Sequence, residues 1–308
     1  MLYLMICIAV GVVSACIQNY FCKNLFRVQS DNLLYQLIIY FIGIIVSLFT
    51  VRLSQPSAYT VHLGLIVGVL IMAEVFCILQ AMRCGPMSLT SLFSMAAMLI
   101  PVCLSPFLWG ERMTPLQIAG TVLVVISMLL ITDVPAELRK LRRKRAGKSG
   151  TPKEETAGQT DSVSLKWLLY AFGAFLFGGC CAIPEKSLVN SVYADQSGVY
   201  AIISFAVVCM ISAAALVIRG IRGERPTLRI TAKRIPLFLF LGTANAAVVL
   251  LIIESIKILP ASVVYCTHNG GRLVLITAMD MLVFKQKLKP VQIAGMAAGL
   301  IAVLFLSM

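Results

Sequence analysis

Four polar side chains gather in one apolar stretch near the end of the chain, YCTHNGGRLVLITAMD. Tyr265, His268 and Arg272 have the spacing i, i+3, i+7, which places them on one face of a helix, with Asn269 beside it. A charge inside a membrane costs roughly 2.5–3.5 kcal/mol, so a guanidinium group there is a functional candidate. Arg272 would bind a carboxylate or phosphate through two hydrogen bonds, or be held by an internal acid. His268 would be a hydrogen-bonded cavity histidine or a proton carrier.

Three more polar residues lie within other apolar stretches. Glu74, in LIMAEVFCILQ, would bind a proton or neutralise a cation such as Arg272. Glu254 lies nearer the end of its stretch, where it would line a cavity or sit at the membrane interface. Asn245, in GTANAAVV, would line the cavity through its amide, or the small residues around it would serve close helix contact.

A matched pair of segments adds three candidates. GVVSACIQN aligns with GGCCAIPEK, so Gln18 and Asn19 correspond to Glu185 and Lys186. Pro184 would break its helix at that place. We expect Gln18, Asn19 and Lys186 to contact a ligand or a gate, and an ion pair at the interface is the alternative for Lys186.

These side chains are positioned by apolar runs of helical length. A membrane-spanning helix needs about 17–25 mostly apolar residues, and lipid forces each run to satisfy its own backbone hydrogen bonds. A strand barrel is excluded because the runs are continuous and do not alternate. Ten candidate spans are predicted, at roughly 2–21, 33–52, 61–82, 87–108, 115–132, 165–183, 198–218, 235–257, 261–283 and 290–307.

One segment occurs twice. WGERMTPLQIAG at 109–120 returns as FKQKLKPVQIAG at 284–295, so that Gly120 corresponds to Gly295, 175 positions later. The sequence therefore predicts two similar halves, 1–132 and 165–308. The linker 133–164 between them holds seven Lys and Arg residues between Arg139 and Lys148. We expect this linker to be cytoplasmic and poorly ordered.

Composition and charge predict the surroundings and orientation. Hydrophobic residues make up 59% of the 308 residues and charged residues 13%, against about 25% charged in soluble domains. The net charge of +13 comes from basic residues in the odd-numbered loops, which indicates a cytoplasmic side and not a nucleic-acid partner. Both termini would then lie outside. Five spans per half make the repeat an inverted one.

The motifs resemble those of one known family. The run FLWGERMTPLQIAG, with Pro101, Glu111, Pro115 and Gly120 in place, is similar to the EamA-like branch of the drug/metabolite transporter superfamily. The resemblance covers nearly the whole chain as two five-helix halves. The second half departs from the pattern, since Gln286 replaces the loop acid and Ile276 stands where an inner proline would be. The resemblance implies alternating-access transport of small metabolites and does not identify the substrate.

The prediction is therefore an all-α membrane protein of ten helices in two inverted five-helix repeats. It would be a secondary transporter in the plasma membrane for a small polar metabolite, and an anionic one if Arg272 binds it. Proton or counter-substrate coupling stays open. The alternative is a membrane-embedded enzyme or a protein that handles lipid headgroups, and a channel is the third candidate.

No cofactor, catalytic residue or metal site is expected, because nucleotide and hydrolase motifs are absent and only two histidines occur. The ten cysteines are interpreted as packing residues.

Overall fold

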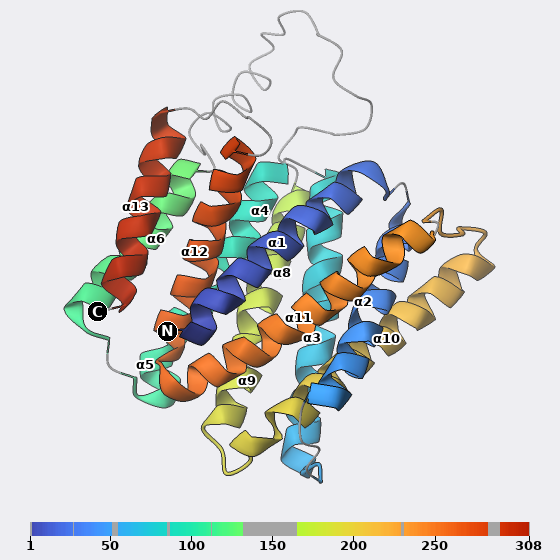
Figure 1. Cartoon of the computed structure of the whole chain (residues 1–308), viewed down its shortest axis with the longest axis horizontal. Coiled ribbons are helices and arrows are strands. Elements are labelled where there is room, and N and C mark those ends of the chain that lie inside the picture. The colour runs from blue at the N-terminus through green and yellow to red at the C-terminus, as the bar shows by residue number, and fades with distance from the viewer. Residues whose placement is uncertain are drawn as a thin grey trace, which may run out of the picture. The chain divides into compact units, whose positions relative to one another are not determined.

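The computed structural model describes residues 2–26, 28–50, 55–84, 87–111, 113–131, 165–228, 231–282 and 290–307, and within these ranges it is helical (Figure 1). The predicted linker 133–164 lies outside the described residues. The helices are α1 Leu2–Asn24, α2 Gln29–Thr50, α3 Ala58–Cys84, α4 Met87–Ala96, α5 Leu99–Trp109, α6 Pro115–Ile131, α8 Leu165–Cys180, α9 Ala182–Val189, η1 Ala194–Gln196, α10 Ser197–Ile221, η2 Ala232–Arg234, α11 Ile235–Ile258, α12 Ala261–Leu282 and α13 Pro290–Ser307.

The predicted apolar stretches coincide with these helices, and two of the stretches contain a break. The fourth stretch divides into α4 and α5 at Ala97–Met98, four residues before Pro101. The sixth divides into α8 and α9 at Cys181, three residues before Pro184. A proline ring displaces the carbonyl four residues earlier and donates no hydrogen bond, which accounts for both breaks. The break predicted at Pro184 is thus confirmed, slightly upstream of the proline itself.

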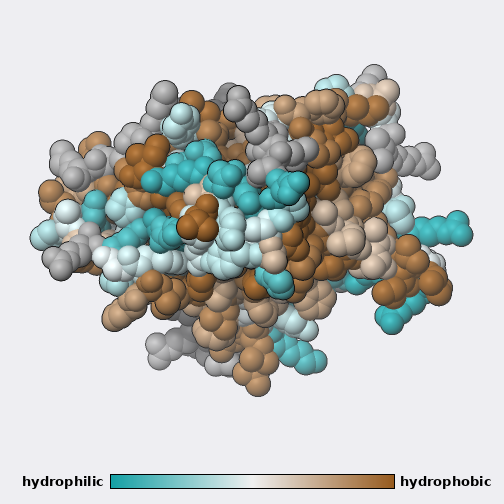
Figure 2. All heavy atoms as spheres, turned by 90° about the horizontal axis from the view of Figure 1, so that it is seen from below, coloured by the Kyte–Doolittle hydropathy of each residue, from teal (hydrophilic) through white to brown (hydrophobic). Residues whose placement is uncertain are grey.

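Several helices have the length and composition of membrane spans. Among the described residues five such stretches occur, at Gln29–Thr50, Ala58–Ala81, Leu165–Val189, Ala194–Ile221 and Ile235–Ile258. Large apolar side chains are exposed on them and on shorter helices, Phe49 and Phe107 being 87% and 86% exposed. Figure 2 shows such hydrophobic side chains over much of the visible surface. This surface suits lipid better than water, so a membrane protein is supported.

The chain divides into two compact units, and each unit takes helices from both sequence halves. The first comprises Met1–Met72 and Cys181–Val264, and the second Ala73–Cys180 and Tyr265–Met308. Helices α3 and α12 each begin in the first unit and end in the second. The predicted halves 1–132 and 165–308 are therefore a different division of the chain from these units.

In the first unit, α2 and α10 lie side by side (Figure 1). The Tyr40 and Phe205 rings pack edge to face with centroids 5.4 Å apart. The Leu37 carbonyl accepts a hydrogen bond from Cys209 Sγ at 3.7 Å. A Cβ atom at Gly43 would lie 3.3 Å from the ring of Phe205. Because numbers fall along α2 as they rise along α10 in these contacts, the two helices run antiparallel.

Glycines bring two more helices against this pair. A Cβ atom at Gly68 of α3 would lie 2.6 Å from Cβ of Val207 on α10. A Cβ atom at Gly242 of α11 would lie 2.5 Å from Cβ of Ile42 on α2. Only glycine permits such close helix contact, since any side chain would displace the neighbour.

In the second unit, α6 and α13 lie side by side (Figure 1). A Cβ atom at Gly120 would lie 3.1 Å from the carbonyl oxygen of Ala302, and Ser127 Oγ donates a 2.7 Å hydrogen bond to the Gly295 carbonyl. These contacts again run antiparallel. Both copies of the repeated QIAG glycine thus lie at this helix crossing.

The rest of the repeated motif ends one helix and begins the next. Gly110, in the left-handed conformation with φ 64°, ends α5. The Ser105 hydroxyl donates a hydrogen bond to the carboxylate of Glu111. Thr114 and Gln117 then form a capping box. The Thr114 backbone N–H donates a 3.1 Å hydrogen bond to Gln117 Oε1, and the Gln117 backbone N–H donates a 3.2 Å hydrogen bond to Thr114 Oγ1. The first copy of the motif is therefore explained by loop and cap geometry.

Candidate functional site

The predicted polar stripe lies on an unbroken helix, α12. Tyr265 and His268 are buried, with 8% and 5% of their surface exposed, and Asn269 and Arg272 are partly buried. The Asn269 amide donates a 3.0 Å hydrogen bond to the Tyr265 carbonyl and so stays close to its own helix. The Gly270–Gly271 pair lies within this helix and does not interrupt it.

The opposite face of α12 is used for packing. Cys266 Sγ lies 3.7 Å from Thr121 Oγ1 of α6, and a Cβ atom at Gly270 would lie 3.2 Å from Val124 of the same helix. Cys266 and Gly270 are one turn apart, whereas His268 and Arg272 lie about 200° around the helix from Gly270. The polar stripe is therefore turned away from α6.

Glu74 lies in the second unit, where α3 meets α8. Its side chain is partly buried and lies on Gly178, because a Cβ atom there would lie 2.7 Å from Glu74 Oε1. One turn further, Cys77 Sγ would lie 2.9 Å from a Cβ atom at Gly173. No ion pair between Glu74 and Arg272 occurs in the described part of the chain.

A second group of predicted residues meets in the first unit, around the end of α11. Lys186 of α9 is 6% exposed, and its Nζ donates a 3.3 Å hydrogen bond to the Ile256 carbonyl. Glu254 forms an ion pair with Lys257 at 2.5 Å, and Lys257 Nζ also lies 3.4 Å from Ser197 Oγ of α10. Ser197 was not predicted, because a single serine that belongs to no motif does not indicate a functional site.

The remaining candidates lie apart from this group along their helices. Asn245 is on α11, and its Nδ2 atom is buried without a hydrogen-bond partner among the described residues. Gln18 is exposed on α1. Asn19 lies on the same helix, but its side chain is outside the described part. The site residues thus divide between the units, with Glu74 and the α12 stripe in one and Lys186, Glu254, Asn245 and Gln18 in the other.

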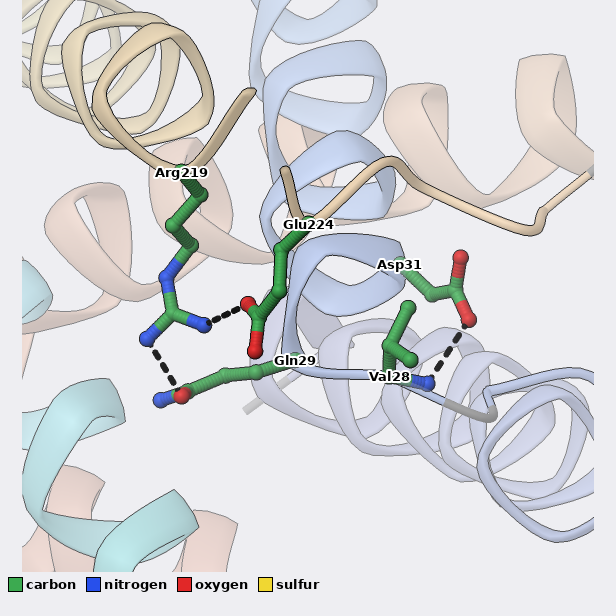
Figure 3. A network of polar contacts seen from close by, with 5 residues as sticks. All are labelled: Val28, Gln29, Asp31, Arg219 and Glu224. Atoms are coloured by element: carbon green, nitrogen blue, oxygen red, sulfur yellow. Dashed lines mark hydrogen bonds and ion pairs between the residues drawn. The ribbon is translucent and has the colours of Figure 1, made fainter. Parts of the chain in front are cut away.

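The strongest polar cluster was not predicted. Asp31 at the start of α2 is fully buried, and its carboxylate accepts hydrogen bonds from the described residues Val28, Thr227 and Leu228. The donors are Val28 N at 3.0 Å, Thr227 N at 2.5 Å, Thr227 Oγ1 at 2.7 Å and Leu228 N at 2.7 Å. Beside it, Arg219 bonds Gln29 at 2.5 Å and Glu224 at 2.6 Å (Figure 3). We call Asp31 and its donors the Asp31 clasp; it ties the loop after α10 to the start of α2.

A similar cluster surrounds Gln196, at the start of α10. Its Oε1 accepts hydrogen bonds from Thr60 Oγ1 at 2.7 Å and Ser57 N at 3.0 Å, and its Nε2 donates to the Gln55 carbonyl at 3.1 Å. We call this set the Gln196 clasp; it ties the segment before α3 to the start of α10. Both clasps hold a loop against a helix start through hydrogen bonds between residues more than 130 positions apart.

Neither clasp nor candidate site has the composition of a metal centre. The described residues contain no group of three or more His, Cys, Asp or Glu side chains that could hold a metal ion.

The chain resembles known proteins in fold only. No family model and no curated protein matches it. A solved structure described only as "Crystal structure of protein" is similar over 98% of each chain, with a TM-score of 0.67 and 14% sequence identity. At this identity the likeness shows the fold alone.

Proposed function

We propose that this protein is a secondary transporter of ten membrane spans in two inverted five-helix repeats. It would move a small polar metabolite across the plasma membrane by alternating access, as the resemblance to EamA-like transporters implies. The proposal is supported by the residue contacts that the two sequence halves repeat, because inverted repeats are the construction of many secondary carriers.

The contacts of the first unit come in exchanged pairs. Gly68 and Gly242 are 174 positions apart, and Ile42 and Val207 are 165 apart. Gly68 packs on Val207, and Gly242 packs on Ile42. The two glycines correspond to each other in the repeat, and so do the two residues that they contact. Such an exchange is expected when two copies of one unit are related by a twofold axis.

The second unit supports the same relation and its inversion. Gly120 and Ser127 correspond to Gly295 and Ala302, each 175 positions later. Gly120 packs on Ala302 as Ser127 bonds Gly295, which is again an exchanged pair. Corresponding helices in both pairs, α2 with α10 and α6 with α13, run antiparallel. Copies that face the membrane in opposite directions have this property.

The clasps follow the repeat as well. Asp31 and Gln196 are 165 positions apart, the same interval as Ile42 and Val207. Each accepts hydrogen bonds from the segment that leads into a corresponding helix, α11 for Asp31 and α3 for Gln196. The Asp31 clasp joins the start of α2 to the loop after α10, and both belong to odd-numbered loops of the predicted topology, in agreement with a shared cytoplasmic side.

The α12 stripe supports the choice of substrate. Arg272 offers a planar pair of donors that suits a carboxylate or phosphate, and Tyr265 and His268 lie on the same face. We therefore propose an anionic group on the substrate, bound by Arg272. Glu74 and Asn269 complete the proposed ligand-contacting residues of the second unit. Lys186, Glu254, Asn245, Gln18 and Asn19 remain predicted ligand contacts of the first unit.

A ligand screen followed by counterflow tests the proposal. Thermal-shift measurements on the purified chain against a metabolite library would select the solute. Liposomes loaded with that solute should then take up labelled solute in a saturable exchange without an energy source. Conversion of the solute into a product would favour the enzyme alternative, and unsaturable conductance would favour a channel; either result would overturn the carrier.

A further inference from the structure

Glu74 lies where α3 packs on α8, and a glycine on α8 leaves room for its carboxylate. Gly178 faces the carboxylate directly, and Gly173 faces Cys77 one turn away. Any residue larger than glycine at position 178 would collide with Glu74 Oε1, at 2.7 Å from the Cβ atom. The carboxylate therefore has a fixed place between two apolar helices, where an isolated charge is costly.

The repeat supplies an internal comparison for this residue. The counterpart of Glu74 is Val248 of α11, 174 positions later. Val248 lies at the equivalent contact of α11 with α1, where its carbonyl accepts a hydrogen bond from Cys7 Sγ at 3.6 Å. A valine satisfies the packing at that contact. The acid at position 74 is therefore not required by the helix contact, and another function must account for its cost.

The Glu74 carboxylate lies near the break between α4 and α5, because a Cβ atom at Gly178 would lie 2.7 Å from Glu74 Oε1 and 3.3 Å from Ala97 Cβ. The carboxylate makes no hydrogen bond and no ion pair in the described part of the chain, and it is not fully enclosed. Next to Gly178, a Cβ atom at Gly179 would lie 2.6 Å from the carbonyl oxygen of Ala97, at the break between α4 and α5. Carboxylate and backbone carbonyl oxygens at broken helices are the ligands by which carriers hold coupling cations.

We propose that Glu74, together with the carbonyl oxygen of Ala97 at the α4–α5 break, forms a binding site for one monovalent cation that couples to transport. This inference rests on the proposed carrier function and names its coupling site. The cation is Na⁺, held by the oxygens, or a proton, held by the carboxylate. The titratable neighbour on the same helix is Cys77; Gly173, Gly178 and Ala97, on the elements packed against Glu74, carry no titratable group.

Cation binding can be tested on the purified full chain without knowing the substrate. The melting temperature Tm is measured in NaCl and in N-methylglucamine chloride at equal ionic strength and mildly alkaline pH. A Na⁺ site should raise Tm by about 5 °C when Na⁺ is a hundredfold above Kd. Glu74→Gln and Glu74→Val should abolish the rise, and Glu224→Gln, which removes an exposed carboxylate, should keep it.

A proton site gives a different signature. Tm would then not respond to Na⁺, and infrared spectra at neutral pH, where exposed carboxyl groups are ionised, would show the C=O stretching band of a protonated carboxyl group. Glu74→Val should remove this band and Glu224→Gln should retain it. Glu74→Val introduces the residue found at the matched position, Val248. This variant should therefore fold even if Glu74→Gln does not.

Two results would overturn the site: the same Na⁺ response and the same band in Glu74→Val as in the wild type, or neither signal in the wild type. The outcome is separate from that of the carrier proposal. Counterflow can succeed in a protein without this site, and cation binding at Glu74 can be observed in a protein that shows no counterflow.

Discussion

Arg272 is the residue on which the substrate class depends. Arg272→Lys keeps the positive charge but loses the planar pair of donors, so the variant should fold and bind anions more weakly. Carboxylate- or phosphate-bearing solutes that raise the Tm of the wild type should raise that of Arg272→Lys by much less. Arg222→Lys, on the exposed loop after α10, is the matched control and should respond as the wild type does. Equal stabilisation of both variants, or stabilisation by neutral solutes alone, would return Arg272 to a structural role.

Asp31 is the residue on which the first unit most depends. Asp31→Asn places an amide N–H₂ group where donors already converge, so it leaves a buried N–H without an acceptor. We expect a loss of about 2–4 kcal/mol of unfolding free energy, seen as a lower Tm. Glu224→Gln alters an exposed ion pair only and should lose less than about 1 kcal/mol. A Tm of Asp31→Asn equal to that of Glu224→Gln would show that the clasp is not stabilising.

Polar residues inside the protein could be predicted only where they interrupt an apolar run. Glu74 and Arg272 are visible in the sequence because charges interrupt apolar runs. Asp31 and Gln196 are not, because they lie at helix starts, where polar residues are common and usually exposed. Their importance comes from segments more than 130 positions away, and no local pattern predicts which carboxylate will meet which loop.

At the scale of the helix, the central prediction concerns glycine contacts. Gly68→Ala and Gly242→Ala would each place a methyl group within 2.6 Å of a β-branched side chain on the neighbouring helix. Each should lower stability by about 1–3 kcal/mol through overpacking. Gly220→Ala, at the end of α10 with nothing within 4 Å, should be neutral or slightly stabilising. If the two variants had the same Tm as Gly220→Ala, the close helix contacts at Gly68 and Gly242 would be contradicted.

The helices themselves could be predicted from the sequence, and their partners could not. Apolar length fixes where a helix can lie in lipid, and Pro101 and Pro184 fix the two breaks. The repeated QIAG segment predicted similar halves but not that Gly120 and Gly295 lie at one helix crossing. Pairing depends on shape across the contact, such as Phe205 over Gly43, and this information is spread over distant segments.

For the whole molecule, the proposed carrier mechanism depends on the inversion of the two repeats. Met113 and Leu288 occupy the same position in the two copies of the repeated loop, 175 apart. Single Met113→Cys and Leu288→Cys variants, in a chain whose ten native cysteines are replaced, can be labelled with an impermeant maleimide. The inverted repeat predicts that Met113→Cys is labelled in intact cells and Leu288→Cys only after the membrane is opened. Labelling of both from the same side would contradict it.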